Sequence, residues 1–294
     1  MNNYKLSDET KTTPCGTVLH RVVATTTFTL ASGITINAGD LGGWIEKESN
    51  LSDNAWVSDN AQVYGDARVS GDALVFGNAL VTSDAWVYGN AQVFGNAQVY
   101  GNALVYDNAM IYGNAQVYGK SRVYSNAEVY NGAKVSGNAK ISGNTTVSGD
   151  AEVYGNAQVS GDAFVSGDAQ VYGYAKVGGD TLVYGKAKVS GDAMVCGNAR
   201  VYGDAEISGN ALVYGDTLVR GDAQIMHVSD YMVFKNNWSS GRYFTWTKSN
   251  DMWTVGCFYG TGDELIEKAY ADSENSGKHY EAYVKFVETL KNME

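Results

Sequence analysis

Val63-Tyr64-Gly65-Asp66-Ala67-Arg68 is one unit of a six-residue repeat that runs through the middle of this chain. From position 51 to position 225 every sixth residue is aliphatic, and 25 of these 30 positions hold valine. The residue four places later is always small, and it is alanine at 25 of 29 positions. The exceptions to alanine are Ser121, Thr145, Thr181 and Thr217. The phase never slips, so this repeat decides the fold of the segment.

The order Ala-x-Val-x alternates between small or aliphatic residues and variable ones, which is the period of a β-strand. The alternation predicts, for example, that Val135 faces inward and Lys134 faces outward. Gly-Asn or Gly-Asp follows most of the short strands and favours a tight turn, because these residues tolerate positive φ. Short strands and tight turns that repeat in this way predict a coil whose turns stack as parallel strands about 4.8 Å apart. Its interior is then a column of valine and alanine.

The repeat resembles that of the hexapeptide-repeat family of left-handed β-helices. The resemblance implies a left-handed coil with three hexads in each triangular turn. The 29 hexads would then form about ten coils, with a length of roughly 45 Å. The expected fold class is an all-β solenoid with an N-terminal cap and a small C-terminal α+β domain.

Both ends of the chain carry a closer resemblance. Tyr4-Lys5-Leu6-Ser7, followed by Gly42-Gly43-Trp44-Ile45-Glu46 and Asn50-Leu51-Ser52, resembles the N-terminal region of YdcK-type hexapeptide proteins of bacteria and their phages. Thr254-Val255-Gly256-Cys257-Phe258-Tyr259-Gly260-Thr261 resembles an extra C-terminal domain of phage and prophage relatives. The resemblance implies no defined activity.

Three regions are expected: an N-terminal β cap at 1–50, the solenoid at 51–225 and an α+β domain at 226–294. In the cap, 27–30 and 34–36 are candidate strands. In the C-terminal domain, 231–234, 243–246 and 252–258 are predicted strands. Thr261 and Glu264 fit a capping box that opens a helix through about residue 270. The helical spacing of Tyr280, Tyr283, Val284, Val287 and Leu290 predicts a final amphipathic helix.

The charge of the chain disfavours some partners. A net charge of −11 argues against binding to nucleic acid or anionic membranes. No run of about 18 apolar residues suggests a membrane span, and no secretion signal is visible at the N-terminus. The cysteines, Cys15, Cys196 and Cys257, are few and far apart, which favours a reducing cytoplasm.

Catalytic residues are not expected in the solenoid. Acyltransferases and zinc anhydrases on this fold need histidines in the coils, whereas His20, His227 and His279 all lie outside the repeat. Asp150, Asp168, Asp204 and Asp222 share a corner column that Lys186 interrupts, and turn formation accounts for them without a metal. We therefore predict no enzyme, no cofactor and no metal. The remaining catalytic candidates are His227, Asp230 and His279.

The outward residues differ among the three faces of the predicted coil. One face is polar, with glutamine, lysine and glutamate. Another gathers apolar side chains over consecutive coils, where stacking of aromatic rings or a binding surface would explain them equally well. The candidate binding residues on this apolar face are Trp56, Phe76, Phe94, Met110, Tyr112 and Tyr130.

Three functions remain open from the sequence. The first is a phage-encoded, non-enzymatic scaffold or protein-binding module. In this interpretation the solenoid is a rigid spacer and also provides the surface for self-association. The second is a phage inhibitor of host defence that mimics nucleic acid. The repeat holds 17 acidic and 10 basic residues, which is sparse beside a DNA duplex. The third is an enzyme whose site lies in the C-terminal domain.

Overall fold

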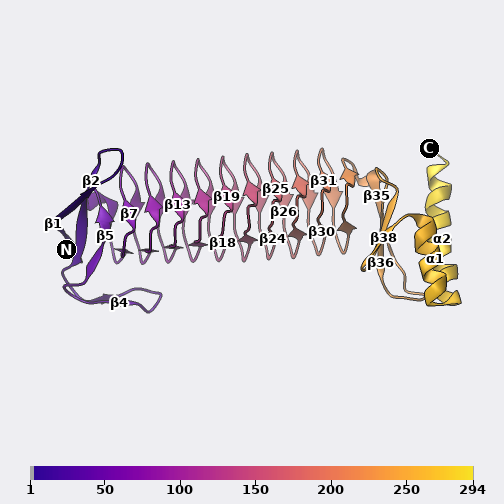
Figure 1. The fold of residues 1–294 in the computed structure, drawn as a ribbon, viewed down its shortest axis with the longest axis horizontal. Coiled ribbons are helices and arrows are strands. Elements are labelled where there is room, and N and C mark those ends of the chain that lie inside the picture. Colours follow the sequence, from indigo (N-terminus) through magenta and orange to yellow (C-terminus); the bar gives the residue numbers. More distant parts are fainter. Residues whose placement is uncertain (1–2, 294) are drawn as a thin grey trace.

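Each hexad forms a two-residue strand followed by a turn, and the strands stack into a long rod (Figure 1). The structure is a computed structural model that describes residues 3–293. Strands 18 residues apart pair in parallel, as Leu80 does with Gln62 and Val81 with Val63. Three hexads therefore complete one coil, and the parallel β-solenoid of about ten coils is confirmed. The left-handed sense of the coil stays a prediction from the resemblance.

The strands form three sheets along the rod. One sheet contains β7 (Gln62–Val63), β10 (Leu80–Val81), β13 (Gln98–Val99), β16 (Gln116–Val117), β19 (Lys134–Val135), β22 (Glu152–Val153), β25 (Gln170–Val171), β28 (Lys188–Val189), β31 (Glu206–Ile207) and β34 (Gln224–Ile225). The second contains β8 (Arg68–Val69), β11 (Trp86–Val87), β14 (Leu104–Val105), β17 (Arg122–Val123), β20 (Lys140–Ile141), β23 (Gln158–Val159), β26 (Lys176–Val177), β29 (Met194–Val195) and β32 (Leu212–Val213). The third contains β6 (Trp56–Val57), β9 (Leu74–Val75), β12 (Gln92–Val93), β15 (Met110–Ile111), β18 (Glu128–Val129), β21 (Thr146–Val147), β24 (Phe164–Val165), β27 (Leu182–Val183), β30 (Arg200–Val201) and β33 (Leu218–Val219).

The turns are hydrogen-bonded from coil to coil as well as the strands. The amide of Asn138, for example, donates to the carbonyl of Gly155 at 2.7 Å. Gly137, which precedes Asn138, has a φ of +66°, and a Cβ there would lie 2.8 Å from the amide nitrogen of Gly155. Glycine is therefore required at this corner both by the backbone conformation and by the close approach of the next coil.

The core is the predicted column of valine and alanine. Val135 is fully buried, as are its neighbours along the column. The polar residues that replace alanine are equally buried, and each donates its hydroxyl to a carbonyl three residues earlier. Thr145, for instance, donates to Ser142 at 2.6 Å. These hydroxyls enter the core without leaving an unpaired donor.

The N-terminal strands continue the first sheet beyond the solenoid. β1 (Tyr4–Thr12) pairs antiparallel with β2 (Val18–Ala24), and β2 pairs with β5 (Leu41–Ile45). β5 then pairs in parallel with β7. A 3-10 helix, η1 (Glu48–Asn50), leads into the coils. The long strands β1 and β2 were not among the predicted elements, and they cover the backbone edge that a bare first coil would expose.

A small hairpin, β3 (Phe28–Thr29) with β4 (Thr35–Ile36), lies under the first coils and confirms the two predicted strands (Figure 1). Phe28 meets Trp56 edge-on, with ring centroids 5.9 Å apart. Trp56 is only 2% exposed and shares a core with Leu30 of the hairpin. The prediction that Trp56 belongs to an open binding face is therefore wrong, because the hairpin covers it.

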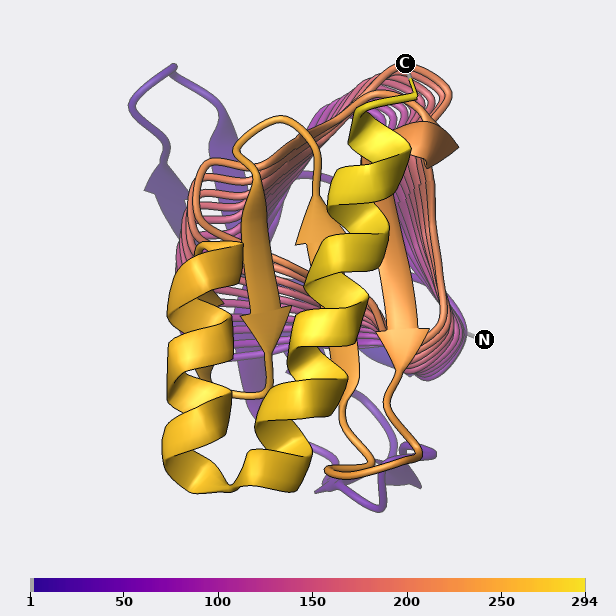
Figure 2. The same ribbon diagram turned by 90° about the vertical axis from the view of Figure 1, so that its right-hand side faces the viewer.

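The C-terminal domain is a four-stranded antiparallel sheet with two helices on its outer side (Figure 2). After the 3-10 helix η2 (Val228–Asp230), the elements are β35 (Tyr231–Lys235), β36 (Tyr243–Thr247), β37 (Met252–Val255), β38 (Phe258–Gly260), α1 (Gly262–Asp272) and α2 (Glu274–Lys291). The predicted capping box is confirmed, since Thr261 and Glu264 each accept the other's backbone amide. The predicted single strand over 252–258 is two strands, because Gly256 adopts a φ of +58° and turns the chain.

Candidate functional site

The predicted apolar face contains a ladder of stacked rings. Successive ring centroids are 4.7 to 4.9 Å apart, and neighbouring rings are parallel to within 10°. The ladder consists of Phe76, Phe94, Tyr112 and Tyr130, one from each coil. Met110 lies beside it on β15. The structure thus brings together five of the six predicted residues, each half-buried, and leaves Trp56 out.

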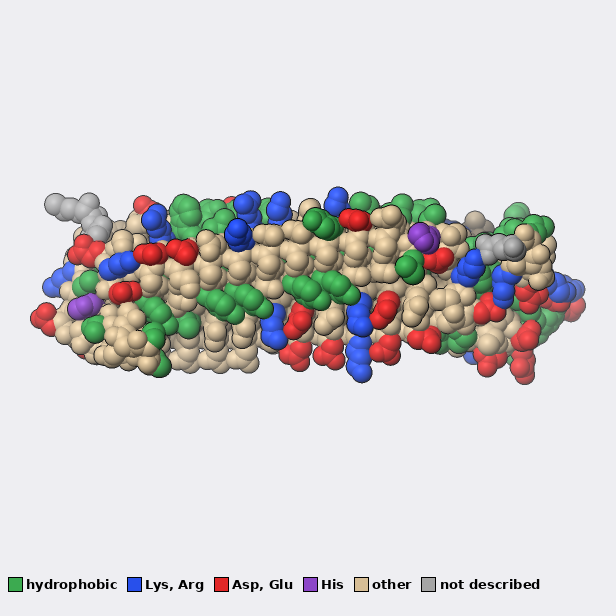
Figure 3. Space-filling model, turned by 90° about the horizontal axis from the view of Figure 1, so that it is seen from above, with side chains coloured by type: hydrophobic (Ala, Val, Ile, Leu, Met, Phe, Trp, Pro, Cys, Tyr) green, Lys and Arg blue, Asp and Glu red, His purple; other side chains and the backbone are tan. Residues whose placement is uncertain are grey.

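Further aromatic ladders and charged pairs follow the rod. Figure 3 shows separate groups of hydrophobic side chains (green) along one face, with basic (blue) and acidic (red) side chains beside them. Tyr88, Tyr106 and Tyr124 stack at 4.9 Å. On the polar face, Lys134 pairs with Glu152 at 3.1 Å and Lys188 with Glu206 at 2.9 Å. Charges on this face are therefore compensated one coil apart.

The aspartate column and the histidines form no metal-binding cluster in residues 3–293. No group of three or more His, Cys, Asp or Glu side chains there could hold a metal ion. Asp230 accepts the backbone amides of Met226 and His227, both at 2.8 Å, so its carboxylate is committed to a turn. His279 lies on α2, where its Nδ1 is 2.7 Å from the carbonyl of Asn275.

The C-terminal domain is fastened to the last coil by one hydrogen bond from each of the three sheets. The hydroxyl of Tyr231 donates to the carbonyl of Leu212 on β32 at 2.9 Å. The amides of Leu218 on β33 and Gln224 on β34 donate to Oγ1 of Thr245 at 3.0 Å and to Oγ of Ser249 at 2.7 Å. These bonds satisfy backbone groups that the end of a solenoid leaves open.

Arg220 adds a second connection between the rod and the C-terminal domain. Its guanidinium lies 4.6 Å from the ring centroid of Tyr259, within the range of cation–π attraction. One of its nitrogens donates to Tyr202 in the solenoid at 3.2 Å, and another donates to the carbonyl of Cys257 at 3.2 Å. The same side chain therefore contacts both parts.

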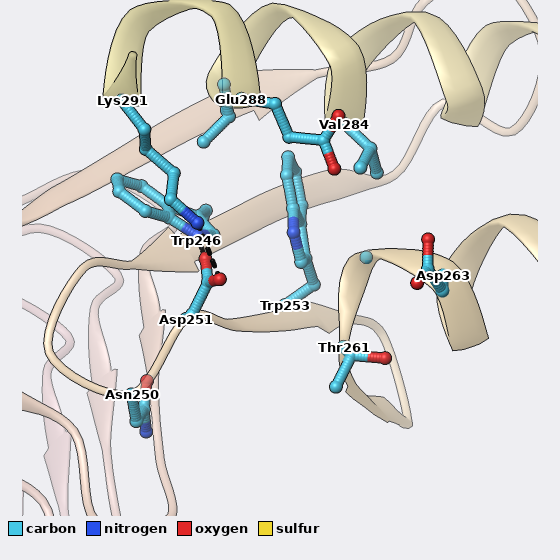
Figure 4. A pocket seen from close by; sticks show the side chains of 11 residues that line it. Trp246, Asn250, Asp251, Trp253, Thr261, Asp263, Val284, Glu288 and Lys291 are labelled. Atoms are coloured by element: carbon cyan, nitrogen blue, oxygen red, sulfur yellow. Dashed lines mark hydrogen bonds and ion pairs between the residues drawn. The ribbon is translucent and has the colours of Figure 1, made fainter.

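A cleft of about 310 Å³ opens between β37, the first turn of α1 and the last turns of α2 (Figure 4). It is lined by Trp246, Asn250, Asp251, Trp253, Thr261, Gly262, Asp263, Val284, Val287, Glu288 and Lys291. No sequence motif points to it, because its side chains come from four elements and from segments up to 45 residues apart. Its volume is at the lower end of the range for small-ligand sites.

Two tryptophans line the cleft, and only one of them has an acceptor for its indole nitrogen among the described residues. Trp246 and Trp253 are cross-strand partners, and each is only 2% exposed, so both belong to the core. Nε1 of Trp246 donates to Oδ1 of Asp251 at 2.8 Å, and the other oxygen of Asp251 accepts from Lys291 at 2.6 Å. Nε1 of Trp253 has no acceptor within residues 3–293.

A second hollow, of about 570 Å³, lies against the exposed face of α2. It is lined by Phe234, Trp238, His279, Ala282, Tyr283 and Phe286. Trp238 is 76% exposed at the tip of the β35–β36 loop. Its backbone amide, like that of Ser239, is held by the side chain of the fully buried Asn236. This hollow is mainly apolar, whereas the cleft carries charged groups.

No helix within residues 3–293 has the length and apolar character needed to cross a membrane. No curated protein matches the chain. Five segments match a family model described as the YdcK β-solenoid repeat: residues 61–76, 97–110, 105–119, 157–173 and 205–221. All five lie in the coils between β7 and β34. These segments of the solenoid are therefore similar in sequence to the repeats of YdcK-type proteins.

Proposed function

We propose that the protein is a non-enzymatic scaffold in which the solenoid is a rigid spacer and the C-terminal domain recognises a ligand or partner. The resemblance of both chain ends supports a bacterial or phage origin, with the C-terminal domain as the addition typical of phage relatives. A cytoplasmic location belongs to the same proposal. The half-buried apolar ladder supports a further role of the solenoid in self-association.

One observation carries the spacer role, namely the set of bonds that fix the C-terminal domain to the last coil. A flexible linker would let this domain tumble, whereas Tyr231, Thr245 and Ser249 bond one strand of each sheet. Within the rod, backbone hydrogen bonds continue from coil to coil through strands and corners. Bending would have to break several of these bonds together, so the two ends are held at a set distance.

The native cysteines allow a direct test of this rigidity. Cys15 in the N-terminal region and Cys257 in the C-terminal domain are exposed. With Cys196 replaced by serine, nitroxide labels at these two positions should give one narrow distance distribution in pulsed electron paramagnetic resonance. Deleting one whole coil, residues 133–150, should shorten the mean distance by about 4.8 Å. A broad distance distribution, or a mean distance that is unchanged by the deletion, would contradict the spacer role.

A further inference from the structure

The cleft of the C-terminal domain has unpaired donors on one side. Trp253 is only 2% exposed and lines the cleft. Its indole nitrogen donates to no described residue, and it is not among the polar atoms that are sealed from solvent. It faces the first turn of α1, since a Cβ at Gly262 would lie 3.4 Å from it. Thr261 caps the amide of Glu264, which leaves the amides of Gly262 and Asp263 without a helical acceptor. These donors favour an oxygen acceptor on a ligand.

Gly262 lets α1 approach α2 closely beside the indole of Trp253. A Cβ at this position would approach Cγ1 of Val284 to 2.7 Å and close the gap between α1 and α2. The gap between α1 and α2 at Gly262 is therefore narrower than a methyl group, and the open volume of the cleft lies to the side of this contact. Val284 and Val287 supply an apolar wall to the same space.

The charges of the cleft favour a cation next to that acceptor. Its lining holds three carboxylates, of Asp251, Asp263 and Glu288, and one ammonium group, of Lys291. Lys291 forms an ion pair with Asp251. The carboxylates of Asp263 and Glu288 form no ion pair or side-chain hydrogen bond with any described residue. In Figure 4 Glu288 reaches from α2 toward the indole of Trp253, and Asp263 lies across the gap on α1.

A positive group that is separated from a carbonyl by a single carbon atom matches this arrangement. We propose that the cleft binds the free amino terminus of a peptide, with the ammonium group between Glu288 and Asp263 and the first carbonyl oxygen accepting from Nε1 of Trp253. An apolar first side chain packs on Val284 and Val287. Capture of a terminal amine by convergent polar groups is a known mode of peptide recognition. The negative lining repels a free amino acid, whose carboxylate would take the place of the carbonyl.

This assignment rests on the proposed recognition role of the C-terminal domain, and its test starts from the ligand. The full chain is titrated calorimetrically with leucyl-glycinamide and with N-acetyl-leucyl-glycinamide. The free amine should bind at least about tenfold more tightly, which corresponds to about 1.4 kcal/mol. Binding should weaken as the pH rises above the pKa of a terminal amine, about 7.7–8.0. Equal affinity for both dipeptides, or no binding of the free amine at millimolar concentration, overturns the assignment.

Three variants locate the binding. Glu288→Gln and Trp253→Phe should each reduce affinity for leucyl-glycinamide severalfold, because the first removes the charge and the second removes the donor together with part of a buried ring. Glu267→Gln is the matched control, since Glu267 is exposed on α1 and does not line the cleft. Unchanged thermal melting establishes that the variants fold. Binding that survives both cleft variants overturns this site, while the spin-label distances still test the rod independently.

Discussion

Lys134 and Val135 are neighbours in one strand and face opposite sides of its sheet. The ammonium group of Lys134 lies 3.1 Å from Oε1 of Glu152, one coil further along the surface. Val135 is completely buried and pairs with Val117 and Val153 in the adjacent strands. This confirms the alternation predicted from the repeat, and it sets two adjacent positions in opposite environments.

Val135→Asp should unfold the rod locally or destabilise it by several kcal/mol, because it buries an unpaired carboxylate among valine and alanine. Lys134→Gln should cost less than about 1 kcal/mol, because the ion pair that it removes is half-exposed. Thermal melting followed by circular dichroism compares the two. Equal melting temperatures would show that the inward and outward assignments are mistaken.

Tyr112 makes the rod sensitive to alkaline pH. Burial, followed by its 3.0 Å hydrogen bond to Glu128, raises the pKa of Tyr112 to about 12. A raised pKa means that the folded state favours the neutral phenol. The stabilisation is therefore complete below the ordinary pKa of 10 and is lost as the pH rises through about 12. We expect stability to fall across this interval.

Glu128→Gln should bring the ionisation of Tyr112 to lower pH, because it removes the nearby negative charge. Part of the shift should remain, since burial is its largest cause. Ultraviolet absorbance of tyrosinate during a pH titration measures this, with Glu206→Gln as a control on another face. If the two variants titrate identically, the Tyr112–Glu128 bond does not hold in solution.

The solenoid could be predicted from the sequence because each hexad determines its own environment. Val135 is buried for the same local reason as every other residue in its column. The cover over Trp56 could not be predicted in this way. Trp56 is covered by Phe28 and Leu30, which belong to a hairpin outside the repeat. The six-residue pattern does not indicate where this hairpin packs.

The cleft escaped sequence reasoning for a similar reason. Trp253, Gly262 and Glu288 are ordinary core, cap and surface residues when each is taken alone. Only the packing of α1 and α2 on the sheet places them around one space. The elements themselves were largely predictable, since the Thr261 capping box and the spacing of Tyr280 and Val284 are local signals.

The protein should bind no acyl-coenzyme A and transfer no acyl group. His20, His227 and His279 all lie outside the coils, and the coils carry no extended loop between β6 and β34. A general base beside an acyl group is therefore missing from the solenoid. Calorimetric titration with acetyl-coenzyme A should show no heat beyond dilution. Micromolar binding would contradict this prediction.

Self-association through the apolar ladder should depend on Phe94 and Met110. The hairpin already shields the end of this face at Trp56, so the surface left for a partner begins near Phe76 and runs toward Tyr130. Stacking explains the alignment of the rings, but it leaves their outer edges and Met110 half-exposed. Covering this surface gains roughly 25 cal/mol for each Å² of apolar area removed from water. A closed symmetric pair is the commonest way to cover it.

Phe94→Lys combined with Met110→Lys should therefore make the particle smaller in sedimentation velocity while its β-sheet circular dichroism is retained. Gln98→Lys with Gln116→Lys is the charge-matched control, because these residues lie on the polar face of the same coils. The control should sediment like the wild type. If the wild-type protein is already a monomer at tens of micromolar, or if both double variants dissociate equally, the ladder serves only to stabilise the rod.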